Sequence, residues 1–351
     1  MSIEQNKLDF FIPRMLGDMG AAAMVPLIRI GDELGLYRAL KDAGPLTSAE
    51  LAARTGTAER YIREWLAAHA ASEYLDYDAA SETFVMTPEQ AMVFADEGGP
   101  LFMLGAFEMY AANARDYPKL VSAFRTGEGV GWHQHDRCLF SGVERFFRSG
   151  YEYHLVPEWL PALDGVVDKL RAGASVADVG CGHGASTLIM ARAFPNSLFA
   201  GFDYHPESIE RARAAAEEAG LWNVSFNVAS AKDFPGEGYD LIAFFDCLHD
   251  MGDPVGAARH ARQALAPGGT AMLVEPLAGD TLAENLNPVG RLYYAASTVI
   301  CTPASLSQEV GLGLGAQAGP KRLSKVLADG GFADVRVAVK TPFNLVVEAR
   351  V

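Results

Sequence analysis

A glycine-rich loop between an apolar run and a helical pattern, VADVGCGHGAS at 176–186, limits the folds open to this chain most strongly. The apolar run predicts a buried strand. Gly180, Gly182 and Gly184 allow a tight turn that brings a ligand close to the backbone at the carboxyl end of that strand. The loop also fits the GxGxxG/A dinucleotide-binding pattern, with Asp203 at about the expected spacing of 20 residues. By itself the loop therefore also fits an NAD-linked oxidoreductase.

Alternating apolar runs and amphipathic segments surround the loop from about residue 172 onward. Strands are expected at SVADVG, LFAGFDY, VSFNVAS, YDLIAFFDCL and TAMLVEP, with helices near 185–194, 206–219 and 253–265. This alternation predicts a parallel sheet covered by helices on both faces. Near the end, DVRVAVKT and FNLVVEAR are separated almost only by Pro342. These two strands must be antiparallel neighbours, because a parallel crossover needs about a dozen residues.

The first hundred residues predict helices followed by a hairpin. Ile30, Leu34 and Tyr37 recur at i, i+4 and i+7, which predicts one apolar helix face. Thr47 and Glu50 form a capping box that opens a short helix. A second helix is expected at 58–71, and β-like runs are expected at 74–77 and 83–86. This order resembles a winged-helix domain.

The charge of this domain argues against DNA binding. Residues 1–100 contain 8 Lys and Arg against 16 Asp and Glu, so 8 − 16 = −8 of the chain's 29 − 44 = −15 lies here. A DNA-reading helix needs a basic face, whereas Arg60 and Arg63 of the second helix are offset by Glu59 and Glu64. We therefore expect a winged helix that serves dimerisation or roofs an active site, and no nucleic-acid partner.

An aromatic-rich helical connector is expected over 99–171. Aromatic residues at helical spacing are typical of a core, and some of them fit the wall of a pocket for a flat ligand. His133 and His135 stand two residues apart in this connector. No third ligand lies at a diagnostic spacing, so we expect no metal site.

The cysteine pattern and the N-terminal segment favour a cytoplasmic protein. Cys138, Cys181, Cys247 and Cys301 lie far apart without a CxxC pair, which favours reduced thiols over a disulfide framework or a zinc ribbon. The first residues lack a secretory signal pattern. Polar residues and Pro26 interrupt the most apolar early run well short of a membrane span of about 20 residues. We therefore expect no membrane partner.

Four further motifs distinguish between the cofactor classes. Asp178 lies within the strand before the GxGxG loop, and the strand YDLIAFFDCLHD ends in a polar cluster. The turn APGG at 266–269 introduces the fifth strand, and the antiparallel pair closes the sheet. Together these motifs resemble the class I S-adenosylmethionine-dependent methyltransferases over roughly 172–351. With the winged helix and the connector, the whole chain is similar to the two-domain small-molecule methyltransferases, including the O-methyltransferases and their bacterial relatives.

The resemblance implies an α/β fold with a Rossmann-like seven-stranded sheet whose last strand is antiparallel, plus an N-terminal α-helical winged-helix domain. The expected domains are a winged helix at 1–98, a connector at 99–171 and a methyltransferase domain at 172–351. An insertion at 277–317 is either a substrate lid or a dimer element. The implied partners are a small-molecule methyl acceptor and a second copy of the chain in a homodimer.

S-adenosyl-L-methionine is the cofactor that the resemblance implies. Asp178 would fix the loop, and Asp203 would accept hydrogen bonds from both ribose hydroxyls, because a carboxylate has two oxygens that match a vicinal diol. The alternative for Asp203 is a helix-capping acid. Tyr204 would flank the adenine. The loop residues beneath the methionine part would be Gly180, Cys181, Gly182 and His183.

The remaining cofactor positions follow the third and fourth strands. The family often places an Asp after the third strand, where this chain has Ser230, Ala231 and Lys232. Each of these has a plain alternative as a strand-end cap or a solvated charge. Phe245 and Asp246 end the fourth strand, and Asp246 would face the cofactor's amino group.

The candidate base lies just beyond the fourth strand, in FDCLHDMGDP. Methyl transfer to a hydroxyl needs alignment and a base, and a neutral imidazole is the usual base near neutral pH. The O-methyltransferases that this chain resembles carry a catalytic His followed by Asp in this segment, and His249 and Asp250 match that pair. Glu275 would orient the base. The alternatives are a capping histidine and an ordinary strand-end charge.

The predicted function is methyl transfer to a small, aromatic or apolar hydroxylated molecule. The alternatives are an S-adenosylmethionine-sensing winged-helix transcription regulator and an NAD-linked oxidoreductase. The acidic winged helix argues against the regulator. The closing antiparallel pair and the His-Asp segment argue against the oxidoreductase. The acceptor atom stays open, because oxygen, nitrogen, carbon and sulfur methylation all occur on this fold.

Overall fold

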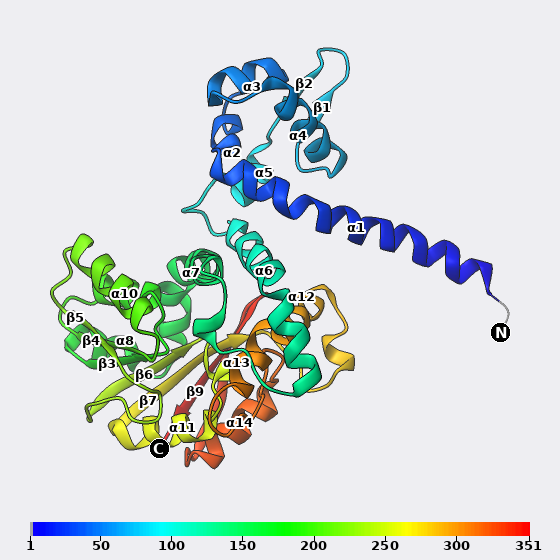
Figure 1. Cartoon of the computed structure of the whole chain (residues 1–351). Coiled ribbons are helices and arrows are strands. Elements are labelled where there is room, and N and C mark those ends of the chain that lie inside the picture. Colours follow the sequence, from blue (N-terminus) through cyan, green and yellow to red (C-terminus); the bar gives the residue numbers. More distant parts are fainter. Residues whose placement is uncertain (1–2) are drawn as a thin grey trace. The chain divides into compact units, whose positions relative to one another are not determined.

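The computed structural model describes residues 3–351 and divides into two compact units. The first unit comprises Met1–Ala114 and Arg137–Ser149, and the second comprises Arg115–Asp136 and Gly150–Val351. The chain passes from the first unit to the second within α6 (Leu104–Thr126) and returns for α7 (Cys138–Gly150) (Figure 1). Residues of the predicted connector therefore belong to both units.

A seven-stranded sheet with strand order β5-β4-β3-β6-β7-β9-β8 forms the second unit (Figure 1). The strands are β3 (Ser175–Val179), β4 (Leu198–Asp203), β5 (Val224–Val228), β6 (Tyr239–Phe245), β7 (Leu265–Pro276), β8 (Asp334–Lys340) and β9 (Asn344–Arg350). Strands β3 to β7 pair in parallel, whereas β9 is antiparallel to both β7 and β8. The predicted sheet with its antiparallel last strand is confirmed.

Helices and a buried core complete this sheet. The helices are α8 (Val166–Ala172), α9 (Ala185–Ala193), α10 (Pro206–Glu218), α11 (Pro254–Ala264) and α14 (Pro320–Asp329). Strand β6 is buried along nearly its whole length, and its residues Ile242 and Phe244 pack in the main core of the unit. The APGG turn lies inside β7 rather than ahead of it, and the β6–β7 register shifts between Tyr239 and Leu241.

The region between β7 and α14 contains the insertion predicted from the sequence. It holds α12 (Pro288–Ala296), a π-helical turn η6 (Ser297–Cys301) and α13 (Thr302–Leu306), preceded by a short 3-10 turn η5 (Ala283–Asn285). Helix α12 continues directly into the π-helical turn η6.

The winged-helix order is also confirmed. The elements are α1 (Gln5–Glu33), α2 (Leu36–Leu40), α3 (Ser48–Thr55), α4 (Glu59–Ala71), β1 (Asp76–Asp78), β2 (Thr83–Val85) and α5 (Pro88–Phe94). The capping box forms as expected, because Thr47 accepts from the Glu50 backbone and the Glu50 side chain accepts from the Thr47 backbone. On α4, Arg60 and Arg63 form ion pairs with glutamates one turn away.

The predicted apolar face of Ile30, Leu34 and Tyr37 is wrong. Helix α1 ends at Glu33, and Gly35 adopts a left-handed φ of 68° before α2 begins. The turn breaks the helical period, so Ile30 and Leu34 are 45% and 50% exposed while Tyr37 is 1% exposed. Helical periodicity applies only within one helix, and this pattern crossed a boundary.

Helix α1 departs from the sequence expectation in a second way. It runs for 29 residues, and within 3–351 it is the helix long and apolar enough to cross a membrane by length and composition alone. The polar residues that we expected to interrupt the apolar run do not prevent α1 from meeting this criterion of length and composition. A helix near the N-terminus is weak support for a membrane span. Most of α1 is exposed. Besides Ile30, its exposed large apolar side chains are Leu8, Phe10, Phe11, Ile12, Met15, Leu16 and Met19, and we call these seven the α1 apolar surface.

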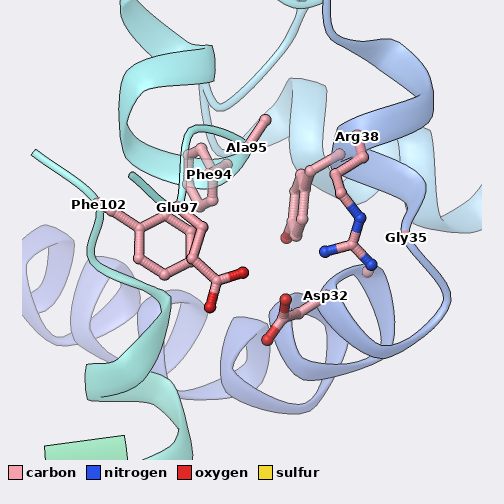
Figure 2. A pocket seen from close by; sticks show the side chains of 9 residues that line it. Asp32, Gly35, Arg38, Phe94, Ala95, Glu97 and Phe102 are labelled. Carbon is pink, nitrogen blue, oxygen red and sulfur yellow. The ribbon is translucent and has the colours of Figure 1, made fainter. Parts of the chain in front are cut away.

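Arg145 forms an ion-pair network in the first unit with carboxylates, two of which line a small pocket. Arg145 contacts Asp32 at 2.7 Å, Glu97 at 2.9 Å and also Glu108. Figure 2 shows the carboxylates of Asp32 and Glu97 facing this pocket, with the ring of Phe102 beside them. Because these carboxylates are already paired with Arg145, the pocket is part of the packing of the unit.

His69 makes the first unit sensitive to mild acid. Its Nδ1–H donates to the Trp65 carbonyl and its Nε2 accepts from the Tyr37 hydroxyl, both at 2.8 Å. Burial lowers the pKa of His69 from 6.5 to about 4. The unfolded chain therefore binds this proton at a higher pH than the folded chain does. The contribution of neutral His69 to stability is full above pH 6.5 and is lost as pH falls toward 4.

We expect the stability of the first unit, followed by hydrogen exchange of the α4 backbone amides in urea, to fall over that pH window. The substitution His69→Gln removes the titrating group and should give a flatter pH dependence. An unchanged slope in His69→Gln would assign the acid sensitivity to other groups.

Candidate active site

The glycine loop lies between β3 and α9 and is fixed against β4. The backbone N–H groups of Gly180 and Cys181 both donate to the Phe202 carbonyl, at 2.7 and 3.0 Å. Gly180 has a φ of 77°, and a Cβ there would lie 2.7 Å from the Cys247 sulfur. Gly182 has a φ of 53° and open space where its Cβ would be. The loop is therefore held from behind and open to a ligand at Gly182.

Asp178 braces the start of α9 and keeps one oxygen unpaired. Its Oδ2 accepts from the hydroxyls of Ser186 and Thr187, each at 2.6 Å. Within 3–351, its buried Oδ1 has no hydrogen-bond partner. Burial raises the pKa of Asp178 to about 6. A cationic donor such as an ammonium group would satisfy the unpaired oxygen and favour the charged carboxylate.

Asp203 ends β4 and connects it to the glycine loop. Its Oδ2 accepts from the Gly182 N–H at 3.0 Å, and its Oδ1 accepts from the His205 N–H at 2.8 Å. Burial raises the pKa of this carboxyl above its usual value. A carboxylate has about four acceptor positions, so Asp203 can accept from these two N–H groups and still receive two further donors. The half-exposed Tyr204 follows directly.

The residues after β5 make the contacts of a strand-end cap and of a surface charge, which are the alternatives to a cofactor role. Ser230 Oγ accepts from the Lys232 backbone N–H at 3.2 Å, as a strand-end cap does. The Lys232 ammonium pairs with the exposed Glu309 at 2.6 Å. Ala231 packs against the main core. No contact here points to a ligand, and a cofactor role for these residues stays a prediction.

Asp246 at the end of β6 is held by two side chains that the sequence did not connect with it. Its Oδ2 accepts from the Tyr151 hydroxyl at 2.8 Å, and its Oδ1 accepts from the Asn344 amide at 3.1 Å. Burial, aided by the Glu275 charge, raises the pKa of Asp246 to about 8. The neighbouring Phe245 is buried, with its ring 5.4 Å from that of Tyr151. Tyr151 and Asn344 lie 95 and 98 residues away along the chain, so no local signal predicted these pairs.

His249 and Glu275 meet at the carboxyl edge of the sheet, as predicted. His249 lies on the 3-10 turn η4 (Leu248–Asp250), and its Nδ1 is 2.5 Å from Oε2 of Glu275 at the end of β7. The other Glu275 oxygen accepts from the Leu248 N–H at 3.1 Å, which fixes the carboxylate. Glu275 is buried and does not face solvent, so the alternative of an ordinary surface charge is wrong.

The second nitrogen of His249 faces Asp250 and Cys301. Nε2 lies 3.1 Å from Oδ1 of Asp250, although that oxygen makes no hydrogen bond of acceptable geometry within 3–351. Burial alone would lower the pKa of His249, but the carboxylates of Asp250 and Glu275 raise it well above 6.5. Cys301 was treated from the sequence only as a reduced thiol, and its place beside His249 had no sequence signal.

The insertion is bonded directly to the segment that carries His249. The Gln308 amide donates to the Asp250 carbonyl at 2.9 Å, and the Ser305 hydroxyl donates to the Met251 carbonyl at 2.8 Å. Gly315 N–H donates to the His249 carbonyl at 3.3 Å. The insertion therefore forms part of the wall of the candidate site.

The structure separates the two histidines of the connector. His133 is exposed, whereas His135 is buried with its Nδ1 2.9 Å from Oδ2 of Asp116. Within 3–351, the buried Nε2 of His135 has no hydrogen-bond partner. Burial lowers the pKa of His135, and the charge of Asp250 acts on it. The side-chain partner of His135 Nδ1 is therefore Asp116.

Comparison with known families matches both parts of the chain. Residues 170–330 match a family model described as a methyltransferase domain. Residues 21–95 match a model described as an Rv2258c-like winged HTH domain.

The sequence matches to characterised proteins cover only part of this chain. The chain is 32% identical over 131 residues to the 27-O-demethylrifamycin SV methyltransferase of Amycolatopsis mediterranei, covering 35% of this chain and 48% of that protein. It is 34% identical over 102 residues to the trans-aconitate 2-methyltransferase of Streptomyces avermitilis, covering 28% and 38%. The chain thus matches about half or less of the length of these relatives.

Solved structures share the fold at low identity. Mitomycin 7-O-methyltransferase MmcR has a TM-score of 0.71 at 19% identity, over 99% of this chain and 100% of that one. Human N-acetylserotonin methyltransferase in complex with SAM has a TM-score of 0.69 at 20% identity, over 97% of each chain. The chain therefore carries a methyltransferase domain over residues 170–330, preceded by a winged helix-turn-helix domain over residues 21–95.

Proposed function

We propose that this protein transfers a methyl group from S-adenosyl-L-methionine to a hydroxyl group of a small, aromatic or apolar metabolite, with His249 as the base. The observation that carries the proposal is the buried imidazole of His249, held by Glu275 at the same sheet edge as the glycine loop. The named relatives act on small molecules, which supports a small acceptor.

The cofactor residues would be those that the resemblance implies. The unpaired Oδ1 of Asp178 fits the ammonium of a methionine part, and the free acceptor positions of Asp203 fit a ribose diol. Tyr204 would flank the adenine. When bound, S-adenosyl-L-methionine supplies a methyl group on a positively charged sulfur that leaves as a neutral thioether.

Residues of the chain itself carry out the remaining steps of methyl transfer. Glu275 accepts the Nδ1–H of His249 and so presents Nε2 as the nitrogen that removes the acceptor's proton. The oxygen of the acceptor then takes the methyl group while His249 carries the proton. Asp250 stabilises the imidazolium that results. The insertion at 277–317 would act as a lid, supported by its bonds to the His249 segment.

Binding and turnover test the proposal separately. Isothermal titration of the full chain should show binding of S-adenosylmethionine and of its demethylated product, and none of NAD. Mass spectrometry of a panel of phenols incubated with protein and cofactor should find a product heavier by one methyl group. Binding of NAD alone would support the oxidoreductase instead. Retention of specific DNA at physiological salt, with no methylated product, would support the regulator.

The proposal includes a cytoplasmic protein without a nucleic-acid partner. The four cysteines stand as thiols in the described part of the chain. The two arginines of α4 are paired with glutamates, so that helix offers DNA no open basic face.

A homodimer through the α1 apolar surface completes the proposal. Leu8, Ile12, Met15 and Met19 recur at helical spacing and stay exposed, and an exposed apolar stripe of this kind is typical of an interface. We expect light scattering to give twice the chain mass, and Leu16→Glu to give the monomer mass.

The substitution Leu198→Glu, at an exposed leucine outside α1, is the matched control and should leave the dimer intact. If Leu282→Glu in the insertion gave monomers while Leu16→Glu did not, the insertion would be the dimer element and the assignment to α1 would be wrong.

A further inference from the structure

Three side chains of different ligand type converge beside the candidate base. His249, Asp250 and Cys301 each offer one ligand atom, and the three atoms lie within 4.8 Å of one another. Because Glu275 holds Nδ1, the nitrogen of His249 left for this cluster is Nε2. His249 and Cys301 are buried, and Asp250 is partly buried.

We infer that His249 Nε2, a carboxylate oxygen of Asp250 and the Cys301 sulfur form a binding site for a thiophilic divalent cation such as Zn²⁺. Zinc bonds of about 2.0 to 2.3 Å place ligand atoms within roughly 4 Å of one another, so the cluster needs only a small contraction. A set of one imidazole, one carboxylate and one thiolate favours zinc over magnesium or calcium, which prefer oxygen ligands.

The surroundings of the cluster match those of known metal sites. A histidine that binds zinc through one nitrogen usually donates the other N–H to a carboxylate, which is what Glu275 accepts from His249. Oδ1 of Asp250 is buried and makes no hydrogen bond of acceptable geometry within 3–351, and it lies 3.1 Å from Nε2 of His249, so one cation can contact both atoms.

The backbone around the cluster is already fixed. His249 and Asp250 lie on η4 and Cys301 ends η6. Residues further along the insertion hold η4 by the bonds from Gly315 to His249 and from Gln308 to Asp250. Three protein ligands leave a fourth position open for water. On binding, the S–H bond of Cys301 breaks and its proton leaves to solvent, as does any proton on Nε2.

Zinc at this site would inhibit the enzyme. A bound cation occupies the lone pair of Nε2, which then cannot take a proton from an acceptor. This consequence rests on the proposed role of His249 as the base, whereas zinc binding itself does not. The site would therefore make methyl transfer sensitive to thiophilic metals and restorable by a chelator.

The test uses the full chain, stripped with a chelator and titrated with Zn²⁺ or Co²⁺ alone. We expect one equivalent bound, with thiolate-to-cobalt charge-transfer absorption in the near ultraviolet. Cys301→Ser should remove that absorption and weaken zinc at least about tenfold, the smaller end of what disturbing a metal site costs. Cys138→Ser, at a partly buried cysteine outside the cluster, is the matched control and should bind zinc as the wild type does.

Two outcomes would overturn the site: no binding above a nonspecific level, or equal zinc affinity and cobalt absorption in Cys301→Ser. If Cys301→Ser does not fold, X-ray absorption of the wild-type zinc complex decides, since a sulfur shell at about 2.3 Å is expected and a shell of nitrogen and oxygen alone contradicts the site. Zinc binding without inhibition would overturn the competition with the base and leave methyl transfer itself untouched.

Discussion

Replacing His249 with Gln is expected to lower kcat for methyl transfer to a hydroxyl acceptor by about 10²- to 10⁴-fold, the usual contribution of a positioned base. Affinity for S-adenosylmethionine should stay close to the wild-type value, because the contacts of Asp178 and Asp203 do not involve His249. Single-turnover kinetics, with product measured by mass, separate the two effects. His154→Gln, at an exposed histidine on another helix, is the control.

The pH profile of the same reaction tests how His249 acts. A base must be neutral, and Asp250 and Glu275 raise the pKa of His249 above 6.5, so kcat/KM should rise with pH through a midpoint above 6.5. Asp250→Asn removes one of the charges that favour the imidazolium, so its midpoint should move to lower pH. Unchanged kcat in His249→Gln, or an unmoved midpoint in Asp250→Asn, would leave His249 as a structural residue only.

Replacing Asp203 with Ala should weaken binding of S-adenosylmethionine at least about 100-fold, or about 2.7 kcal/mol. Each hydrogen bond to a charged group contributes roughly 1.5 to 3 kcal/mol, and two to the ribose are proposed. The loss of the acceptor for Gly182 N–H would also loosen the loop. Isothermal titration with the demethylated product measures the change without turnover.

The control for Asp203→Ala is Glu207→Gln, which removes an exposed carboxylate two residues into α10. Asp203→Asn keeps one acceptor oxygen and should fall between Ala and the wild type. If Asp203→Ala lowered thermal stability but left the affinity unchanged, Asp203 would be a helix cap and nothing more.

Short-range sequence patterns predicted the sheet well because they depend on interactions between residues that are close in the chain. The strand pair around Pro342 has only one possible arrangement when a crossover is too short, and β8 and β9 are indeed antiparallel. The capping box at Thr47 satisfies backbone donors within four residues, so its form is independent of the rest of the fold. The His249–Glu275 contact was predictable because both residues follow strand ends that must meet at one edge.

Contacts between segments that are far apart in the sequence leave no local pattern from which they could be predicted. The bonds of Tyr151 and Asn344 to Asp246 depend on how the chain before β3 and the last strand pack. Cys301 reaches His249 only through the path of the insertion. The exposure of Ile30 and Leu34 follows from a turn at Gly35 that a periodic pattern does not record.

The position of β9 between β7 and β8 sets an order of assembly. Among the strands of residues 3–351, β8 pairs with β9 alone, so residues 334–340 have no place in the sheet until residues 344–350 have inserted beside β7. As the chain is synthesised, β3 to β7 can pair while β8 stays unpaired. Asn344, which opens β9, brings its amide to Asp246 in that same step. The candidate site therefore receives one of its restraints only when the sheet closes.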